Sequence, residues 1–565
     1  MKSIVRFVFF FTISLNAQNW DWLSLATSLR VDGISRLETD ANGNSYVAGW
    51  VEENILLSDN INIVSGSEYF TPFIGKYDES GIPIWAISIY ADASSNFQTT
   101  RAVPNIFPSN DGGLLFYGEY LTKATIDGVE LDSPREKNAY LSGLDSEGFL
   151  SWHERLASSD DQLAIGDLRQ DGEGSIYLSG YFRGNMEIKG EEVYRERNTT
   201  FVLKLSQDRS LEWLYVPEVS PEGSTYSVGM VINTEGELYI SGLFYGVVDF
   251  EDSQAIAGDM FGQYILKFDS DGEQLWMRYL SDANYVDIDG LSLDTYGNLY
   301  IAGELEGVLN FEGNTYDKEV GGGVYVVKYS PNGDPIWLHQ YGGLGNGGAN
   351  YPRMQMAYYN RIYLSGKYFD NVVFGAFVFE KENFFYGKNL FLLELNSEGD
   401  VVNAKDMADY LTMPDSEGQS DKSDDIYISG MSVDQAGDLL IGGIYAGRLF
   451  MNNQHVECYD YTFTIPHSGD LFIGKLSTGE LSQTEEEKAN AFLLASNVVD
   501  ASAILYLEEP IRVRLLNING QVLRSYTFTA GEHYIETSSY SSGMYILQYE
   551  NSLGAHFQEK LFIAH

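Results

Sequence analysis

The feature that most constrains the fold is a short apolar segment, ending in glycine, that recurs along most of the chain. Its copies, such as SYVAG and LYISG, end at Gly49, Gly118, Gly180, Gly242, Gly303, Gly366 and Gly443. Successive copies lie 69, 62, 62, 61, 63 and 77 residues apart. A nearly regular period of this length indicates a repeat architecture, in which each unit is one small group of secondary-structure elements.

A second motif follows each copy of the first, and YILKFDSDGEQLW (264–276) is representative. A short alternating strand enters a polar turn that carries glycine, and the next strand opens with tryptophan. Each unit therefore holds two hairpins; in the first unit we expect strands at about 34–39, 44–51, 72–78 and 83–89. Seven units of four strands predict an all-β fold, a seven-bladed β-propeller.

The last unit lacks one strand of this pattern. It ends FIGKLSTGELS (472–482), with no tryptophan strand after its glycine. NWDWLSLATS (19–28), near the N-terminus, resembles PIWAISIYAD (83–92) of the first unit. We therefore expect residues 20–28 to form the outermost strand of the last blade, because this pairing covers an open sheet edge.

Residues 19–481 resemble the seven-bladed propeller repeats that are common in secreted bacterial proteins. The resemblance rests on the patterns D-x-x-G-N-x-Y-x-x-G and K-[YF]-D-x-x-G-x-x-x-W. It implies the fold and leaves the ligand open, because propellers host many functions.

The N-terminal sequence MKSIVRFVFFFTISLNAQ has the pattern of a signal peptide, which we assign to residues 1–17. Lys2 and Arg6 precede an apolar run that is too short to span a membrane, and no later stretch is long enough to be a transmembrane segment. Cys458 is the only cysteine, so no internal disulfide can form. These features predict an exported protein whose stability comes from packing.

The C-terminal part has another rhythm. After a propeller assigned to residues 18–481, the acidic run in SQTEEEKANAF indicates a linker over 482–497. IRVRLLNINGQVLRSYTF (511–528) reads as two alternating strands around an Asn-Gly turn, and further strands follow. We expect a small β-sandwich over residues 498–565.

This tail resembles the type A C-terminal sorting domain of proteins that Bacteroidetes-type bacteria export by type IX secretion. The matching residues are Asn517, Gly520, Gly531, Gly543, Tyr545 and Lys560. The resemblance implies that residues 498–565 engage the type IX secretion machinery. The protein would then be secreted or reach the outer-membrane surface. An accessory sandwich that merely binds something is the alternative.

Charge restricts the partners. The chain has 35 Lys and Arg against 81 Asp and Glu, a net charge of −46, which disfavours binding to nucleic acid. DSDGE (269–273) and DANGN (40–44) space oxygen atoms as calcium loops do, but calcium takes about 6–8 oxygen ligands. The same residue types are those that hairpin turns need. We therefore expect turns and no cofactor, with weak calcium binding left open.

Departures from the repeat are the best places to seek a ligand site, because loops carry function. The sixth unit inserts FGAFVFEKENFFYGKN (374–389), in which Phe384, Phe385 and Tyr386 are candidate stacking residues for a glycan or a peptide. Packing of an extra hairpin is the alternative reading. The seven histidines show no metal-ligand spacing, and no catalytic residue is assigned.

The sequence therefore predicts a secreted or cell-surface propeller that acts as a non-enzymatic binding or adhesion module. The alternative is an extracellular polysaccharide lyase or hydrolase built on the propeller face. A compact cluster of histidine, arginine and carboxylate side chains at the central channel would favour the enzyme.

Overall fold

The computed structural model divides the chain into two compact units, Met1–Thr478 and Gly479–His565. The residues that it describes are 20–26, 32–51, 55–58, 61–63, 71–91, 103–121, 123–126, 128–250, 253–257, 261–280, 285–286, 290–312, 314–342, 348–357, 360–369, 371–379, 389–407, 425–434, 437–446, 448–451, 454–457, 470–476, 492–494, 498–499, 502–507, 511–517, 522–529, 531–541, 543–550 and 556–563. The predicted signal peptide lies outside these ranges.

Strands make up the regular structure of the described residues, which contain no α-helix. Within this part of the chain, no helix is long and apolar enough to cross a membrane. The all-β prediction is confirmed.

The first repeat unit shows how the sequence produces a blade. Its strands are β2 (Asp32–Thr39), β3 (Ser45–Val51), β6 (Thr71–Tyr77) and β7 (Pro83–Ser88), paired antiparallel in the order β2-β3-β6-β7. Every end of these strands lies within two residues of the predicted one. β6 is buried along its whole length and β3 along most of it, whereas β7 is partly exposed. This gradient is typical of a sheet with its two middle strands covered on both faces.

The later units repeat this order of four antiparallel strands. Their strands are β9 (Asn105–Pro108), β10 (Leu114–Tyr120), β13 (Lys137–Leu144) and β14 (Leu150–Ser159); β15 (Gln162–Gln170), β16 (Ile176–Ile188), β17 (Glu191–Leu205) and β18 (Leu211–Tyr215); β20 (Ser224–Ile232), β21 (Leu238–Tyr245), β24 (Gly262–Phe268) and β25 (Gln274–Leu280); β27 (Gly290–Leu293), β28 (Leu299–Phe311), β29 (Asn314–Tyr329) and β30 (Pro335–Tyr341); β31 (Gly348–Met356), β32 (Ile362–Phe369), β35 (Asn389–Leu395) and β36 (Val401–Asp406); and β37 (Asp425–Val433), β38 (Leu439–Ala446) and β41 (Asp470–Leu476).

Short additional strands lie mostly between the second and third strands of a unit. They are β4 (Ile55–Ser58), β5 (Ile61–Ile63), β8 (Tyr90–Ala91), β11 (Ala124–Ile126), β12 (Val129–Leu131), β19 (Glu218–Val219), β22 (Val247–Phe250), β23 (Ser253–Ile256), β26 (Tyr285–Val286), β33 (Val372–Phe374), β34 (Phe377–Phe379), β39 (Arg448–Met451) and β40 (Gln454–Glu457). Most pair as small hairpins beside the main sheets.

The hydrophobic core lies between neighbouring units rather than inside any one of them. Tyr177 and Val202 of the third unit share one cluster of buried residues with Ile240 and Leu266 of the fourth. Other clusters join units one and two, two and three, four and five, and five and six in the same way, and one joins the first unit to Leu440 and Ile473 of the last. Face-to-face packing of successive sheets is the architecture of a β-propeller.

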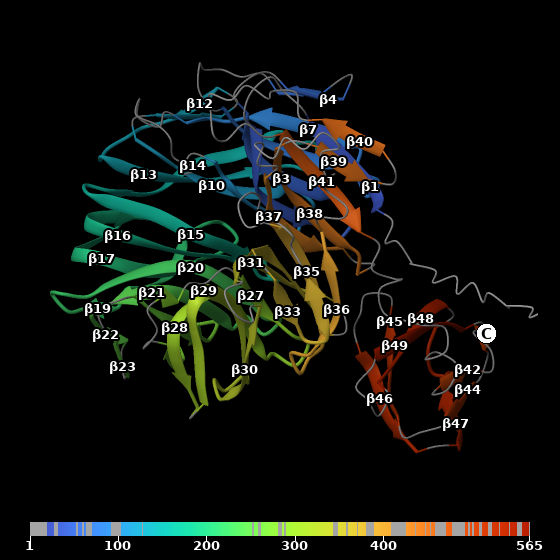
Figure 1. Ribbon diagram of the computed structural model, residues 1–565. Coiled ribbons are helices and arrows are strands. Elements are labelled where there is room, and N and C mark those ends of the chain that lie inside the picture. Colours follow the sequence, from blue (N-terminus) through green and yellow to red (C-terminus); the bar gives the residue numbers. More distant parts are fainter. Residues whose placement is uncertain are drawn as a thin grey trace, which may run out of the picture. The chain divides into compact units, whose positions relative to one another are not determined.

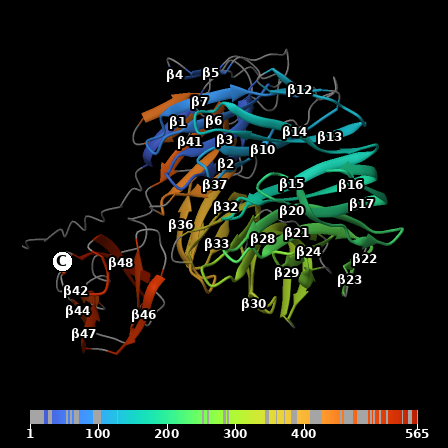
Figure 2. The same cartoon turned by 180° about the vertical axis from the view of Figure 1, so that it is seen from behind.

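The first strand of each unit contacts the first strand of the next, in the order β2, β9, β15, β20, β27, β31 and β37. β37 in turn contacts β2, where the Thr39 hydroxyl lies 2.7 Å from that of Ser432. These strands therefore surround a common axis, and the sheets radiate from it (Figures 1 and 2). The number of blades stays a prediction.

The predicted closure by the N-terminal segment is confirmed. β1 (Trp20–Ala26) pairs antiparallel with β41, which gives the last unit the strand order β1-β41-β38-β37. Trp22 lies opposite Lys475, just as Trp85 of the first unit lies opposite Lys76. The N-terminal strand thus occupies the place that the repeat leaves empty.

The second compact unit, Gly479–His565, is a two-sheet sandwich. One sheet has the order β42-β44-β47 and the other β43-β49-β48-β45-β46. The strands are β42 (Phe492–Leu494), β43 (Val498–Val499), β44 (Ser502–Leu507), β45 (Ile511–Asn517), β46 (Val522–Phe528), β47 (Gly531–Glu536), β48 (Gly543–Glu550) and β49 (His556–Ile563). Leu505 and Ile535 of the first sheet pack against Leu515 and Leu547 of the second.

One predicted boundary differs in the structure. β42 lies within residues 482–497, which the sequence assigns to a linker, and it pairs with β44 of the sandwich. The three apolar residues Phe492–Leu494 follow the acidic run and supply an edge to the smaller sheet. The first strand of the sandwich therefore precedes residue 498.

Candidate functional site

The turn in KFDSDGEQLW (267–276) has the oxygen spacing of a calcium loop, and one of its carboxylate oxygens is engaged within the turn. Asp269 Oδ1 accepts hydrogen bonds from the backbone amides of Asp271 (3.0 Å) and Glu273 (2.9 Å). Gly272 has a φ of +88°, a conformation that glycine adopts without strain. This is the geometry of a hairpin turn. Among the described residues, no group of three or more His, Cys, Asp or Glu is placed to hold a metal ion.

The tryptophan of this motif contacts the next unit. Trp276 Nε1 donates a hydrogen bond to the carbonyl oxygen of Pro331 (3.0 Å), and Lys267 Nζ donates to the same oxygen (3.1 Å). The indole ring covers Gly333, where an added Cβ would lie 2.8 Å from the ring. Trp276 therefore anchors its strand against the next unit.

This contact recurs, and we call it the Tyr–Lys–Trp cluster. Its members on one unit are a tyrosine, a lysine and a tryptophan, and the next unit contributes a turn carbonyl that both nitrogen atoms reach. In the described residues the four copies are Tyr46, Lys76 and Trp85 on Ser146; Tyr177, Lys204 and Trp213 on Ser270; Tyr239, Lys267 and Trp276 on Pro331; and Tyr300, Lys328 and Trp337 on Ser397. In every copy the ammonium lies over the tyrosine ring, 4.9–5.5 Å from its centroid.

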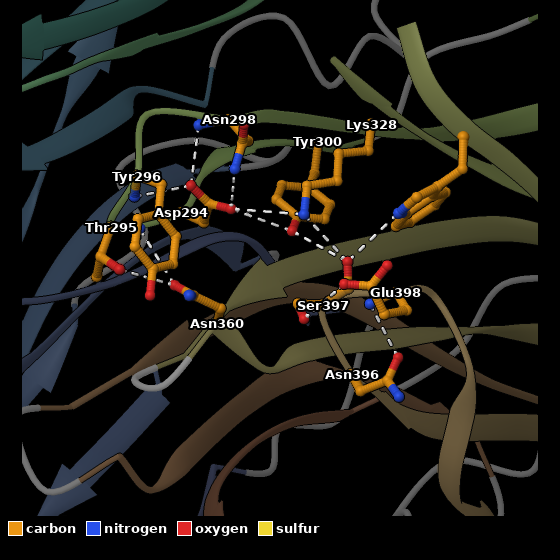
Figure 3. A network of polar contacts seen from close by, with 11 residues as sticks. Asp294, Thr295, Tyr296, Asn298, Tyr300, Lys328, Asn360, Asn396, Ser397 and Glu398 are labelled. Carbon is orange, nitrogen blue, oxygen red and sulfur yellow. Dashed lines mark hydrogen bonds and ion pairs between the residues drawn. The ribbon is translucent and has the colours of Figure 1, made fainter. Parts of the chain in front are cut away.

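Figure 3 shows the copy around Tyr300 together with the turn that supports it. Asp294 Oδ1 accepts the amides of Tyr296 and Asn298, both at 2.9 Å. Its Oδ2 accepts the Asn298 side chain (2.7 Å) and the Tyr300 hydroxyl (3.2 Å). Both carboxylate oxygens of Asp294 are therefore engaged in holding the turn and the cluster, so this network is structural.

Ring closure uses part of the same chemistry. Trp22 Nε1, on the N-terminal strand, donates to the carbonyl oxygen of Glu79 (2.9 Å) in the first unit. Its indole covers Gly81 as Trp276 covers Gly333. Lys475 of the last unit pairs with Asp434 (2.6 Å) and Asp438 (3.3 Å). The joint between the first and last units thus shares the indole contact of the other joints.

A separate group of charged side chains lies on the first strands, around the propeller axis. We call Arg36 and Glu38 of β2 and Asp167 and Arg169 of β15 the axial cluster. Arg169 Nη1 lies 2.7 Å from Asp167 Oδ1, and its guanidinium lies 5.5 Å from the centroid of the Phe107 ring on β9. The other oxygen of Asp167 accepts the amide of Met230 on β20 (2.9 Å). The cluster therefore connects four consecutive units.

Glu38 is the chemically distinctive member of the axial cluster. Burial raises its pKa to about 7, although the nearby Arg169 charge lowers it in part. A carboxyl group with such a pKa can donate or accept a proton near neutral pH. Neighbouring Tyr117 donates its hydroxyl to the carbonyl of Gly166 (2.9 Å), and burial raises its pKa well above the ordinary value. Tyr117 is therefore not an available base.

Histidine is missing from the axial cluster as the structure describes it. His153 lies on the outer strand β14, with Nδ1 2.6 Å from the Ser142 hydroxyl, and burial lowers its pKa to about 4. His339 lies against Trp337, and burial lowers its pKa as well. The described part of the axis thus holds arginine and carboxylate groups without the histidine that the sequence led us to look for.

The predicted stacking residues Phe384, Phe385 and Tyr386 lie outside the described residues, so their prediction stands untested. The sequence did not single out Glu38 and Arg169. They lie in units one and three, and only the ring brings them together. One sequence signal could have identified them: they are charged residues on first strands, where most copies carry apolar or small residues.

The residues of the sorting motif lie in the C-terminal sandwich. Asn517 ends β45 and pairs with Tyr545 of β48, whose hydroxyl donates to the Ser541 carbonyl (3.0 Å). Gly531 and Gly543 open β47 and β48, and Lys560 of β49 pairs with Ile546. Gly520 lies outside the described residues, between the paired strands β45 and β46.

Solved structures similar to this chain include β-propeller domains and a polysaccharide lyase, all at low identity. A PL25 ulvan lyase bound to -[GlcA(1-4)Rha3S]- is 11% identical, covers 74% of this chain and 91% of its own, and has a TM-score of 0.41. The β-propeller domain of the Trilobed protease from Pyrococcus furiosus is 9% identical over 77% and 99%, with a TM-score of 0.37. The Dos1 propeller is 9% identical over 81% and 96%, with a TM-score of 0.35.

No curated protein matches the chain. A family model does match its C-terminal part: residues 497–564 fit the family described as secretion system C-terminal sorting domain. This agrees with the resemblance of the tail to type IX sorting domains and with its sandwich of eight strands in the described residues. The chain is thus a β-propeller protein whose residues 497–564 are similar to the sorting domains that direct export to the cell surface or the extracellular space.

Proposed function

We propose that this protein is a non-enzymatic binding or adhesion module that works outside the cell or on its surface. One observation carries the proposal: the polar side chains that recur in the repeat are engaged in joining the units, in the four Tyr–Lys–Trp clusters. What the described surface offers to a partner is instead a set of exposed aromatic side chains, among them Tyr245 and Phe261. Aromatic side chains supply much of the contact area in binding surfaces.

The C-terminal sandwich supports the location that this function needs. In the proposal, residues 498–565 engage the type IX secretion machinery, and the propeller is the exported part that meets a glycan or a protein outside the cell. Removal of the sandwich should therefore retain the propeller inside the cell envelope. Fractionation of cells that express the full chain and the shortened chain tests this step.

The test of the function is a binding screen with the full chain from residue 18, against arrays of glycans and peptides, with and without calcium. We expect retention of a ligand without release of products. Equal binding with and without calcium would agree with the assignment of DSDGE and DANGN as hairpin turns rather than calcium loops. Robust turnover of any polysaccharide would overturn the non-enzymatic proposal.

The axial cluster favours a second candidate, a polysaccharide lyase or hydrolase. Glu38 would exchange the proton, and Arg36, which is exposed beside it, would bind an acidic group of the substrate. The raised pKa of Glu38 gives the pH dependence: a reaction that needs its protonated form would slow as pH rises through about 7.

Glu38→Gln tests the second candidate, with Glu173→Gln on an exposed turn as the matched control. If the axial cluster is catalytic, Glu38→Gln abolishes polysaccharide turnover while Glu173→Gln leaves it unchanged. Absence of turnover by the unmodified chain over pH 5–9 would reject this candidate.

A further inference from the structure

Four aromatic side chains of the third and fourth units form a continuous series on the propeller. Tyr181 of β16 contacts Tyr226 of β20 (ring centroids 4.9 Å apart), Tyr226 contacts Phe261 (6.0 Å), and Phe261 contacts Tyr245 at the end of β21 (5.8 Å). Adjacent rings are inclined by 56–71°, so they pack edge to face or tilted. We call these residues the aromatic cluster.

The aromatic cluster lies at one face of the ring. Tyr226 is near the start of the first strand β20, Tyr245 ends the second strand β21, and Phe261 directly precedes the third strand β24. Because the strands are antiparallel, these three positions meet at the same end of the blade. Tyr245 is 41% exposed and Phe261 is 40% exposed, so two rings of the cluster are open to a ligand.

Two polar contacts lie next to the aromatic cluster. The Tyr226 hydroxyl accepts a hydrogen bond from Asn198 Nδ2 (2.9 Å), which leaves its own hydrogen to be donated elsewhere. Arg183, near Tyr226, is paired through two nitrogen atoms with Asp161 (2.5 and 2.9 Å). Its charge is therefore already compensated, and no cation of this pair is left for an acidic ligand.

We infer that the aromatic cluster is the ligand site of the propeller and that it takes a neutral polysaccharide. Sugars present apolar C–H faces and many hydroxyl groups, which fit exposed rings beside tyrosine hydroxyls and an amide. The net charge of −46 repels acidic polysaccharides. A protein partner would need about 20–30 residues on each side of a stable interface, and four side chains match a few sugar rings instead.

The inference rests on the proposed binding function, and a pair of variants separates the two. The double variant Tyr245→Ala/Phe261→Ala removes both exposed rings, and Tyr194→Ala removes an aromatic ring that is 60% exposed on the β17 hairpin. All three substitutions are on exposed side chains, so the melting temperatures should stay close to that of the unmodified chain. The full chain is run through native gels that contain laminarin or galactomannan as neutral probes, or alginate as the acidic probe.

We expect a neutral polysaccharide to retard the unmodified chain and Tyr194→Ala, and the double variant to bind at least tenfold more weakly. Equal retardation of the double variant would overturn the site while leaving the binding function in place. Retardation by alginate alone would overturn the neutral polysaccharide as ligand. A tryptic digest of casein serves as the peptide probe, and binding of the chain to these peptides alone would overturn it as well. Degradation of a probe without stable binding would overturn the site and the proposed function together.

Discussion

The Tyr–Lys–Trp clusters of units four and five use the same three residue types in two different electrostatic settings. Lys267 lies 2.7 Å from Glu237, whereas Lys328 lies 3.8 Å from Asp294. Both ammonium groups are almost buried, both donate to a carbonyl of the next unit, and both lie 4.9 Å from a tyrosine ring centroid. The difference between them is the position of the carboxylate.

The two turns explain that difference. In unit five the turn begins with Asp294 and ends with Asn298, and the aspartate accepts the turn amides. In unit four the order is reversed: Asn233 accepts the amides of Glu235 (3.1 Å) and Glu237 (2.8 Å), and its Nδ2 donates to the Glu237 carboxylate (2.7 Å). An amide–carboxylate pair spans the turn in both units, so the charge can move from one end to the other while the turn is kept.

The lysines respond to this exchange. Burial by itself acts to lower the pKa of both lysine side chains. For Lys267, hydrogen bonds to Glu237 and Tyr239 outweigh burial and raise its pKa above 10.5. For Lys328, the more distant charges of Asp294 and Glu398 offset only part of the effect, so its pKa stays below 10.5. The comparison teaches that the fold requires the turn and the indole contact, while the strength of the ion pair varies between copies.

The largest effect should come from removing the strand that closes the ring. Deletion of β1 (Trp20–Ala26) exposes the edge of β41 and removes the Trp22 contact with Glu79. We expect a loss of more than about 5 kcal/mol in the free energy of unfolding, because the deletion removes a whole strand pairing together with the partly buried Trp22, and truncation of a single large core side chain costs about 3–5 kcal/mol. Thermal and urea unfolding, against the chain that starts at residue 18, measure it. Unchanged melting would show that closure does not need β1.

Disturbing the contact between the indole ring and the turn glycine should have the second largest effect on stability. Gly333 and Gly297 both have a φ of +78°, but a Cβ at Gly333 would lie 2.8 Å from Trp276, whereas at Gly297 the nearest atom is 3.5 Å away. We expect Gly333→Ala to cost about 3 kcal/mol and Gly297→Ala about 1 kcal/mol, since only the first adds a clash to the backbone strain. Urea unfolding compares them. Equal costs would mean that the indole moves aside freely.

Neutralising the carboxylate should cost more stability in unit five than in unit four. Asp294→Asn leaves Lys328 buried without its counter-ion, and we expect a loss of about 2 kcal/mol. Glu237 is 30% exposed, so Glu237→Gln should cost about 1 kcal/mol. The exchange Asn233→Asp/Glu237→Asn copies the turn of unit five into unit four and should recover most of that loss. If the exchange is worse than Glu237→Gln, the two turns are not equivalent.

The dependence of stability on pH should have opposite signs at the two lysines. The folded pKa of Lys328 is below 10.5, so the unfolded chain holds more protons there and the contribution of Lys328 rises as pH increases toward 10.5. The folded pKa of Lys267 is above 10.5, so its contribution is complete below that pH and is lost above it. Urea unfolding at pH 8–11 of Lys328→Met and Lys267→Met, each compared with the unmodified chain, gives the two slopes. Slopes of the same sign would contradict this account.

The smallest effect is expected at the joint between units two and three, where an arginine rather than a glycine lies under the tryptophan ring. Arg209 takes the place of the turn glycine, with a φ of +67°, and its guanidinium lies 4.3 Å from the Trp152 ring centroid. Arg209→Gly relieves backbone strain of about 1 kcal/mol and loses a cation–π contact of about 1 kcal/mol. We expect a net change within about 0.5 kcal/mol by urea unfolding. A large loss would show that the arginine is essential to this joint.

The predictable part of the fold was what repeats along the chain. Hairpin turns, the tryptophan strands and the substitution of Trp22 for a missing copy follow from local patterns that recur with a fixed spacing. The different position of the carboxylate in the two turns, at Asp294 in unit five and at Glu237 in unit four, could not be predicted, because each turn has an ordinary turn sequence when considered alone. The axial and aromatic clusters could not be predicted, since their members come from different units and meet only through the packing of whole sheets.

Closure of the ring by β1 also determines when the last step of folding can occur. β1 and β41 lie at opposite ends of the first compact unit, so their pairing waits until nearly all of its residues have been synthesised. Contacts between such distant segments form slowly, because the intervening chain must first lose much of its conformational freedom. Completion of the ring is therefore a late folding event, and until then the edge of β41 can pair with another chain.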